Sequence, residues 1–410
     1  MGIAVGYMGT KRYLAEAVSA ALERCKDGII LDAFSGMCSV GEAASLSRNV
    51  WNNDTQVFAS EVAKAFFTSS TPPLSIAQLV VSTFESFNAN KEQLKEIYGG
   101  PLAVEVESLK SSDYQVLAKQ HAEHLHAGNS DALAEKRLEL ASNPQTMPYQ
   151  LATISFSAGY FGVLQAIEID SVRFALDVAR SSGAINIDQH RWALIALCCA
   201  CSKIATTTGH FAQFLKPNSE NIVRFKSQRK KSFWDVWLEC ASELTPIGNK
   251  SWRRRNKVFN KDSLFLLSDL TKSKIKPAVI YADPPYTADH YSRYYHVWDT
   301  LILYDYPEVN GIGRYRQDRF VTPFSVKSQV LQAMSDLVER SRNLNADLVL
   351  SYPDNGLLCL AGGDPVDVLK KHYRHVEVSR CLDYRHSTMG GSTGQSKSDV
   401  KEIIYLARIK

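Results

Sequence analysis

The feature that most constrains the fold is an alternation of short apolar runs and helical patterns that stops and later returns. Near the start, apolar residues 29–31 lead to Asp32, and apolar residues 57–59 lead to Glu61. A further apolar run at residues 278–282 has the length and the bounds of a buried strand. Alternating strands and helices pack as a sheet covered by helices. The sequence therefore predicts an α/β fold whose strands come from two distant parts of the chain.

The stretch between these runs has a different character. Residues 63–255 show helix-like patterns broken by prolines, without the strand rhythm. We therefore divide the chain into a first half of the catalytic sheet domain at residues 1–66, a mainly helical insertion at residues 67–255, and a second half at residues 256–410. In the second half an amphipathic helix leads to a predicted strand at residues 348–352, and two more strand candidates follow.

Composition narrows the class of protein. With 45% hydrophobic and 22% charged residues, the chain of 410 residues matches folded globular proteins. No apolar run approaches the roughly 20 residues that cross a bilayer, and the first residues lack the apolar core of a signal peptide, so we expect a cytoplasmic protein without membrane contact. The eight cysteines lack the paired spacing of a metal site, and we expect no metal.

The most informative motif is a turn directly after the predicted strand at residues 278–282. It consists of Asp283, Pro284, Pro285 and Tyr286. The Asp283 carboxylate and the Pro284 carbonyl accept hydrogen bonds, two successive prolines stiffen the turn, and Tyr286 offers a face for stacking. Such a turn suits a flat base that carries an amine, such as adenine, once the base has left the duplex stack. The ordinary alternative is an Asp-Pro turn that ends a strand, with Tyr286 packed in the core.

A second group of residues follows the first predicted strand. Asp32, Phe34 and Gly36 stand where a strand turns into a helix, and small residues there let the backbone approach a ligand, although a plain strand-to-helix turn looks similar. Glu61 closes the next predicted strand, where an acidic side chain can accept from both hydroxyls of a ribose; a solvated glutamate is the alternative. Asp262 either accepts a hydrogen bond from an adenine or caps a helix.

Taken in order, these motifs resemble the adenine-specific DNA methylases of the D12 class, and among them those that accompany restriction systems. The resemblance begins with Tyr7, Gly9 and Lys11, which otherwise form a simple turn before a helix. It continues through Asp32 and residues 283–286, and the class has its recognition region where the insertion lies. The resemblance implies a Rossmann-like methyltransferase sheet that is mostly parallel and ends in an antiparallel hairpin.

The resemblance also implies roles for single residues. Tyr7 and Lys11 would contact the cofactor S-adenosyl-L-methionine, while Asp283 would lie between the cofactor and the target amine. Of the other acids, Glu61 would hold the ribose and Asp262 the adenine of the cofactor. The full set of expected cofactor-binding residues is Tyr7, Lys11, Asp32, Phe34, Gly36, Glu61, Asp262 and Asp283. Two positions depart from the family pattern, which usually has a glycine where Cys38 stands and an aspartate more often than a glutamate at position 61.

The function that follows is methylation of the N6 amine of adenine in a specific sequence of double-stranded DNA. We expect direct transfer without a covalent enzyme intermediate, with the flipped base stacked on Tyr286 and oriented by Asp283 and Pro284. A cognate restriction endonuclease is an expected partner. Two alternatives remain: the same chemistry on RNA adenine or on a cytosine amine of DNA, and a recognition subunit of a defence complex that binds DNA without methylating it.

Residues 224–257 concentrate basic side chains, with ten lysines and arginines against three acids and with aromatic residues between them. This pattern predicts contacts to DNA phosphates. The residues that we expect to make them are Lys230, Lys231, Arg253, Arg254 and Arg255. The alternative is a solvated helix face with its tryptophans in the core.

Four aromatic residues follow the proline turn closely: Tyr291, Tyr294, Tyr295 and Trp298. We expect them to form a helix that packs over the pocket. For this group, burial in the core is favoured over contact with a base.

Overall fold

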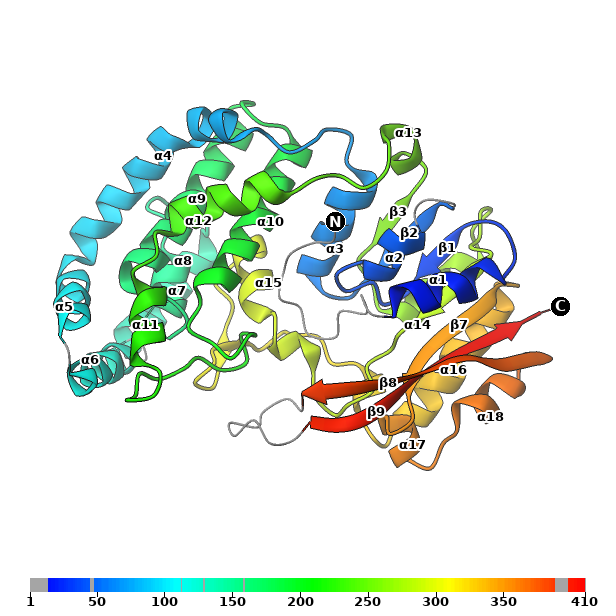
Figure 1. Cartoon of the computed structure of the whole chain (residues 1–410). Helices are drawn as coiled ribbons and strands as arrows, with labels where there is room; N and C mark the ends of the chain where they lie inside the picture. Colours follow the sequence, from blue (N-terminus) through cyan, green and yellow to red (C-terminus); the bar gives the residue numbers. More distant parts are fainter. Residues whose placement is uncertain are drawn as a thin grey trace.

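A seven-stranded mixed sheet forms one part of the protein, on the right in Figure 1, and the helical insertion lies beside it. The computed structural model describes residues 14–44, 48–111, 113–127, 130–157, 159–387 and 397–409, and for residues 125–127, 380–387 and 397–400 it describes the backbone alone. In spatial order the strands are β3 (Lys257–Phe259), β2 (Val50–Asn53), β1 (Ile30–Asp32), β4 (Val279–Ala282), β7 (Asp347–Pro353), β9 (Lys397–Arg408) and β8 (His375–Ser387). The strands from β3 to β7 run parallel, and β9 is antiparallel to both of its neighbours. The predicted α/β fold, mostly parallel with a C-terminal antiparallel hairpin, is confirmed.

The strand predicted at residues 57–59 is wrong. These residues begin helix α3 (Val57–Thr68), and the second strand is β2, which lies earlier in the chain. The physical reason is the spacing of the apolar side chains, because Phe58, Val62 and Phe66 recur every four residues and are buried on one face of the helix.

Successive residues of the strands enter two different cores, as the pleat of a sheet requires. Ile30 packs in one core and Leu31 in the other. The Leu31 side is covered by α14 (Ser263–Thr271), α16 (Val330–Asn343), α17 (Leu357–Leu360) and α18 (Pro365–Lys370). The Ile30 side is covered by α1 (Ala15–Glu23), α2 (Ser39–Ala44) and α3.

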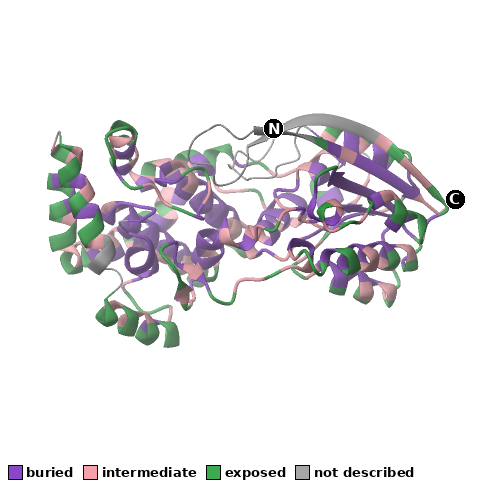
Figure 2. Cartoon of the chain, turned by 90° about the horizontal axis from the view of Figure 1, so that it is seen from below, coloured by how far each residue is buried: buried purple, intermediate pink, exposed green. Residues whose placement is uncertain are grey.

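The insertion is helical, as predicted, and it packs on the Ile30 side of the sheet. Its helices are α4 (Ile76–Ile97), α5 (Gly99–Lys110), α6 (Tyr114–Ala127), α7 (Asp131–Ser142), α8 (Leu151–Phe156), α9 (Val163–Ser181), α10 (Ile187–Ile204), α11 (Ile222–Arg229), α12 (Phe233–Glu243) and α13 (Lys250–Arg253). Apolar residues of α9, α10 and α12 join those of α3 in one continuous core, and buried ribbon extends through both regions (Figure 2). Across the described residues, no helix has the length and apolar content needed to span a membrane.

A segment after β4 connects the sheet with the insertion. It contains the short helices η1 (Tyr291–Arg293), α15 (His296–Leu303) and η2 (Pro323–Ser325) and the hairpin of β5 (Val309–Asn310) and β6 (Tyr315–Arg316). After α15, the Tyr304 hydroxyl donates to Asp170 Oδ1 of α9 at 2.7 Å, and Arg173 Nε of the same helix donates to the Leu301 carbonyl at 3.1 Å. The insertion therefore positions the segment that follows the proline turn.

Candidate active site

An open cavity of about 940 Å³, including the solvent at its mouth, lies at the edge of the sheet where the parallel strands end. Its walls come from the residues that follow β1, β2, β3 and β4, together with Tyr291, Phe320 and Thr322 of the connecting segment. Ligands of parallel sheets bind at this edge, at the point where the strand order reverses. Here that point lies between β1 and β4, because β2 and β3 follow on one side and β7 on the other.

Acidic residues follow each of the four strands at the cavity. In the order of the sheet they are Asp262 after β3, Asp54 after β2, Asp32 at the end of β1 and Asp283 after β4. Neighbouring strands lie about 4.8 Å apart, so three spacings place β3 and β4 about 14 Å from each other. The cavity therefore presents a row of carboxylates that is long enough for an extended ligand.

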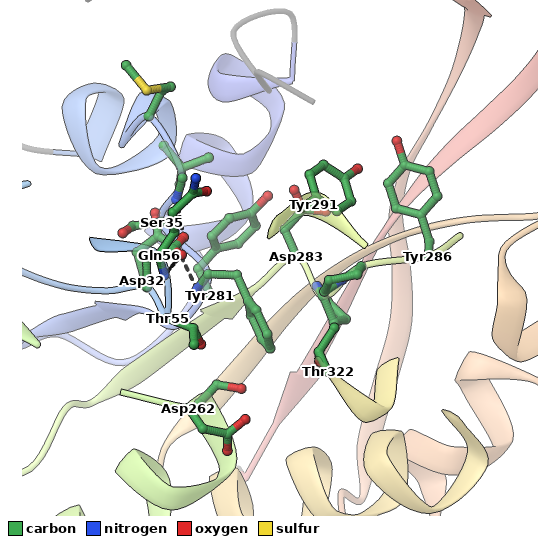
Figure 3. A pocket seen from close by; sticks show the side chains of 18 of the residues that line it. Asp32, Ser35, Thr55, Gln56, Asp262, Tyr281, Asp283, Tyr286, Tyr291 and Thr322 are labelled. Atoms are coloured by element: carbon green, nitrogen blue, oxygen red, sulfur yellow. Dashed lines mark hydrogen bonds between the residues drawn. The ribbon is translucent and has the colours of Figure 1, made fainter. Parts of the chain in front are cut away.

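Two halves of the cavity differ in chemistry (Figure 3). One half is formed by the ends of β1, β2 and β3 and is lined by Asp32, Thr55 and Asp262. The other half is formed by the turn after β4 and carries the rings of Tyr286 and Tyr291, and Asp283 lies on the side of these rings that is nearer to Asp32. Asp283 thus stands between an acidic half and an aromatic half.

The turn after β1 is held in an unusual backbone conformation. Gly36 has a φ of 45°, and two residues later Cys38 has a φ of 58°. Both values lie in the left-handed region, which favours glycine. The Cys38 side chain is fully buried, and this burial raises the pKa of its thiol well above the ordinary value. The cysteine noted as a departure from the family glycine therefore occupies a position whose backbone is suited to glycine.

Asp32 is buried beside other carboxylates. Its Oδ1 accepts a hydrogen bond from the Phe34 amide at 3.4 Å, and only 1% of the residue is exposed. Burial raises the pKa of Asp32 well above its ordinary value, and the negative charges of Asp283 and Asp54 raise it further. A cation bound beside the cluster would offset the repulsion between these carboxylates. The acids therefore favour a positively charged ligand.

Asp54 is the acid that the sequence interpretation missed. Its Oδ2 accepts from the Gly36 amide and its Oδ1 from the Gln56 amide, each at 2.8 Å, and burial raises the pKa of its carboxyl group. It thereby joins the turn after β1 to the turn after β2. The sequence carried only a short signal, since the apolar pair at residues 50–51 is followed by three polar residues that end in Asp54.

Glu61 does not reach the cavity wall. It lies on α3, where its carboxylate accepts from Lys64 Nζ at 2.6 Å and from Arg191 Nε at 2.7 Å. Its assignment to a ribose is wrong in its premise, because no strand ends at this residue. The acid that follows the second strand and lines the cavity is Asp54.

Asp262 caps a helix, as one of its two sequence interpretations predicted, and its contact with an adenine stays a prediction. Its Oδ1 accepts from the amides of Leu264 and Phe265 at 3.0 and 3.1 Å, which caps the N-terminus of α14. The residue also lines the cavity. One oxygen of the carboxylate fixes the helix, while the group as a whole faces the space where a ligand would lie.

The proline turn after β4 forms the floor of the aromatic half. All four residues of the turn line the cavity. The Tyr286 carbonyl accepts from the Leu357 amide at 2.8 Å, and its ring meets Tyr352 of β7 edge to face at 6.5 Å. These contacts fix the tyrosine against the neighbouring strand.

The comparison with protein families identifies this arrangement. Residues 7–345 match the model of the D12 class N6 adenine-specific DNA methyltransferases, which is more than half of the chain. The chain belongs to this family.

Among curated proteins, three bacterial methylases match this D12 family member over most of its length. Modification methylase LlaI of Lactococcus lactis subsp. lactis is 23% identical over 98% of this chain and 55% of its own length. Modification methylase StsI of Streptococcus sanguinis is 23% identical over 89% of this chain and 46% of its own length. Type II methyltransferase M.FokI of Planomicrobium okeanokoites is 23% identical over 97% of this chain and 52% of its own length. The chain spans about half the length of the curated relatives that it matches.

Membership of the family implies S-adenosylmethionine as the methyl donor, and the residues that line the cavity fit that molecule. The sulfur of the donor carries a positive charge, and the cluster of Asp32, Asp54 and Asp283 is the kind of environment that stabilises a cation. Among the described residues, no group of histidine, cysteine, aspartate and glutamate side chains is arranged to hold a metal ion. The expected cofactor residues Tyr7 and Lys11 lie outside the described residues.

The basic segment is divided between surface and core. Lys230, Lys231, Arg254 and Arg255 are exposed, whereas Arg253 is 7% exposed. The aromatic residues between them are core residues for the most part, since Phe233, Trp237 and Trp252 are buried.

Arg253 holds the two ends of the insertion together. Its Nε donates to the Ser69 carbonyl at 2.9 Å, just after α3, and its Nη1 donates to the Gly248 carbonyl at 2.6 Å, just before α13. Nearby, Asn256 Nδ2 donates to the Phe67 carbonyl at 3.0 Å. The assignment of Arg253 to DNA is therefore wrong, because its guanidinium is buried among carbonyl groups.

Arg254 and Arg255 stand at the edge of the sheet opposite the cavity. They precede β3, whereas Asp262 follows it, and Figure 1 shows α13 and α14 at opposite ends of this strand. A strand of three residues is about 10 Å long. Arg254 and Arg255 therefore lie at the end of β3 away from the cavity.

Proposed function

We propose that this protein transfers a methyl group from S-adenosylmethionine to the N6 amine of an adenine in double-stranded DNA. The observation that carries the proposal is the position of Asp283 between the acidic half and the aromatic half of one cavity. A cationic donor and a flat acceptor can then meet at this residue. Family membership supports the same reaction.

The acidic half would hold the donor. Bound there, S-adenosylmethionine supplies a methyl group on a positively charged sulfur, which leaves as a neutral thioether. Asp32 would stabilise the ammonium group of the amino-acid portion, Asp54 lies where a ribose would follow, and Asp262 lies at the end suited to the adenine. The order of these acids along the sheet supports this direction of binding.

The proline turn would act on the acceptor. Asp283 and the Pro284 carbonyl would accept the two hydrogens of the N6 amine, which directs the nitrogen lone pair towards the donor. As the N–C bond forms, Asp283 is positioned to receive the proton that the nitrogen loses. Because the two prolines restrict the backbone, little reorganisation is needed in the transition state.

The target adenine would enter the cavity as a flipped base. Asp283 and Tyr286 lie inside walls formed by the sheet and the connecting segment, and a base paired in a duplex cannot reach them. We further propose that the insertion selects the target sequence, because its helices position the connecting segment at the mouth of the cavity. Lys230 and Lys231 are exposed on the insertion and stay in this proposal as phosphate contacts.

The experiment that tests the reaction measures transfer of labelled methyl groups into duplex DNA, into structured RNA and into DNA without adenine. We expect labelling of adenine in duplex DNA alone, and loss of labelling in Asp283→Ala. Asp367→Ala is a matched control, because Asp367 is exposed on α18 away from the cavity. Wild-type labelling by Asp283→Ala, or labelling of RNA or cytosine, would contradict the assignment.

A different measurement separates the enzyme from a recognition subunit without catalytic activity. Such a protein would not bind the methyl donor, so calorimetric titration with S-adenosylmethionine should detect binding only if the cavity is functional. The result that would reject the enzyme is DNA binding without cofactor binding.

A role in restriction and modification is the last element of the proposal. It rests on the names of two relatives, both called modification methylases. Modified-base sequencing of DNA from cells that express the chain would first identify the target. That DNA should then resist a nuclease that cuts at the same site, and cleavage at the unmodified rate would remove this role.

A further inference from the structure

A flipped base has two faces, and the proline turn accounts for only one of them. Among the four aromatic residues that follow the turn, Tyr294 is 5% exposed, while Tyr295 and Trp298 are fully buried. Tyr291 differs, because it is only partly buried and lines the cavity. The sequence interpretation that treated these residues as one packing group is therefore wrong for Tyr291.

The backbone at Tyr291 is firmly positioned. It begins η1, whose end is closed by a hydrogen bond from the Tyr294 amide to the Tyr291 carbonyl at 2.9 Å. The next residue, Ser292, is buried, and its hydroxyl donates to the Phe320 carbonyl at 2.9 Å. Phe320 itself lines the cavity. The loop therefore cannot swing away from the cavity without breaking contacts with a second wall.

The neighbours of Tyr291 fix the direction of its ring. Arg293 lies over the ring of Tyr315 at 5.1 Å, and Tyr294 packs against His210 at 4.6 Å. The ring of Tyr294 meets Tyr291 edge to face at 6.0 Å. These contacts hold Tyr294 against the insertion and Arg293 against the β5–β6 hairpin, and they leave the Tyr291 ring facing the cavity.

The Tyr291 ring lies in the same half of the cavity as the reacting group. Figure 3 shows it beside Asp283 and on the side of Tyr286, away from Asp262. The position of the Tyr291 ring therefore does not suit contact with the adenine or the ribose of S-adenosylmethionine. A partly exposed ring beside a carboxylate and a second tyrosine suits a flat heteroaromatic ligand.

We propose that Tyr291 is the second wall of the target-base site and stacks on the face of the flipped adenine opposite Tyr286. This inference rests on the proposed function, and it makes Tyr291 a residue that contacts substrate. Stacking needs the ring and not the hydroxyl, because every base presents a π face to any aromatic ring.

The test compares three variants on a duplex whose target has been identified by modified-base sequencing. Tyr291→Phe keeps the ring and should retain wild-type kcat/KM for DNA. Tyr291→Leu keeps apolar volume but cannot stack, and Tyr291→Ala removes both. We expect kcat/KM to fall about tenfold or more in Tyr291→Leu and Tyr291→Ala, in line with the measured loss of one base–aromatic stack. Should Tyr291→Ala fail to fold, the pair of Phe and Leu variants decides.

Two further readouts separate stacking from a structural role. The affinity for S-adenosylmethionine, measured by calorimetry, should stay within twofold of wild type in Tyr291→Leu. With 2-aminopurine at the target position, this variant should give brighter fluorescence in the complex than wild type, because an aromatic ring quenches the extruded base. Equal kcat/KM for the Leu and Phe variants, or a loss that matches a weakened cofactor affinity, would overturn the inference.

The two levels of proposal fail differently. If the wild-type protein places no methyl group on DNA adenine, the proposed function itself is rejected. If the wild type methylates adenine and Asp283→Ala does not, while Tyr291→Leu behaves as wild type, only the role of Tyr291 is rejected.

Discussion

The two edges of one sheet differ in what their charged residues do. At the carboxyl edge, the acids after β1, β2, β3 and β4 surround a cavity, and burial raises the pKa of two of them. At the amino edge, basic residues precede β3, but Arg253 is a buried contact between backbone segments and its two neighbours point to solvent. The role of a charged residue therefore depends on which end of a strand it follows or precedes. The number of charged residues in a segment does not reveal that role.

The largest expected effect separates Asp283 from the rest of its edge. Asp283→Asn keeps the shape of the side chain but replaces an acceptor by a donor, so we expect kcat to fall about 10²- to 10³-fold, the usual cost of losing one polar contact to a transition state. Single-turnover methylation measures this change. Cofactor affinity should change by only a few fold. If cofactor affinity and kcat fell by the same factor, the separate roles that we assign to the two halves of the cavity would be contradicted.

Asp32 should show the opposite pattern. Asp32→Asn removes a negative charge that faces the cationic donor, and we expect Kd for S-adenosylmethionine to rise about tenfold, equivalent to roughly 1.4 kcal/mol, while kcat at saturation stays within a few fold. Calorimetry and saturation kinetics measure the two quantities. Unchanged affinity would remove Asp32 from the cofactor site.

The buried acids predict that protein stability and cofactor affinity depend on pH in opposite directions. Because folding raises the pKa of Asp32, the stability that this group contributes is present at low pH and is lost as pH rises through the folded pKa. Without cofactor, the free energy of unfolding should therefore decrease as the pH rises from the ordinary pKa of an aspartate to the raised pKa of Asp32. Cofactor affinity should increase over the same range, because only the ionised carboxylate attracts a cation. Denaturation and binding series at several pH values test both slopes, and Asp32→Asn should flatten each of them.

A smaller effect is expected in the backbone of the turn after β1. Cys38→Gly relieves a left-handed conformation that costs about 1–2 kcal/mol in a residue with a side chain, but it also removes a buried thiol. We expect the free energy of unfolding to rise by about 1 kcal/mol at most, with methyl transfer retained. Chemical denaturation measures the change. A destabilised variant would mean that the packing of the thiol outweighs the strain.

The smallest effect belongs to the amino edge. Replacement of Arg254 and Arg255 by alanine should leave the slope of log affinity against log salt for DNA unchanged, because each lost phosphate contact would lower it by about one unit. Replacement of Lys230 and Lys231 is the matched comparison on the insertion. A flatter slope in the Arg254 and Arg255 variant would show that DNA reaches both edges of the sheet.

Strand ends explain which parts of the site could be predicted from sequence. The sheet and the turn at Asp283 were predictable because a buried strand is a run of apolar residues in the sequence. The turn that follows such a strand lies at the edge of the sheet where ligands bind. Asp262 follows β3, which is not a buried strand, and its role was implied by the family resemblance alone.

Other parts depended on contacts between distant segments. Glu61 was assigned to a strand end because three apolar residues precede it, but helical spacing over the next ten residues prevails. Asp54 follows a strand with only two clearly apolar residues, which is too short a signal to separate from a turn. The fate of Arg253 and of Tyr291 depends on the carbonyl groups and rings brought against them from elsewhere, and no local pattern encodes these.

The contacts of Arg253 and Asn256 have a consequence for how such a protein can change. They bring residues 67–69 and 248–256 to one place, so the chain leaves the sheet and rejoins it at a single point. A segment with adjoining ends can be exchanged for another of different length without moving the strands on either side. The limit is the shared apolar face, since a replacement must cover the same side of the sheet as α9, α10 and α12. New sequence preferences could thus be acquired by recombination at one junction, while the chemistry at the other edge of the sheet is inherited intact.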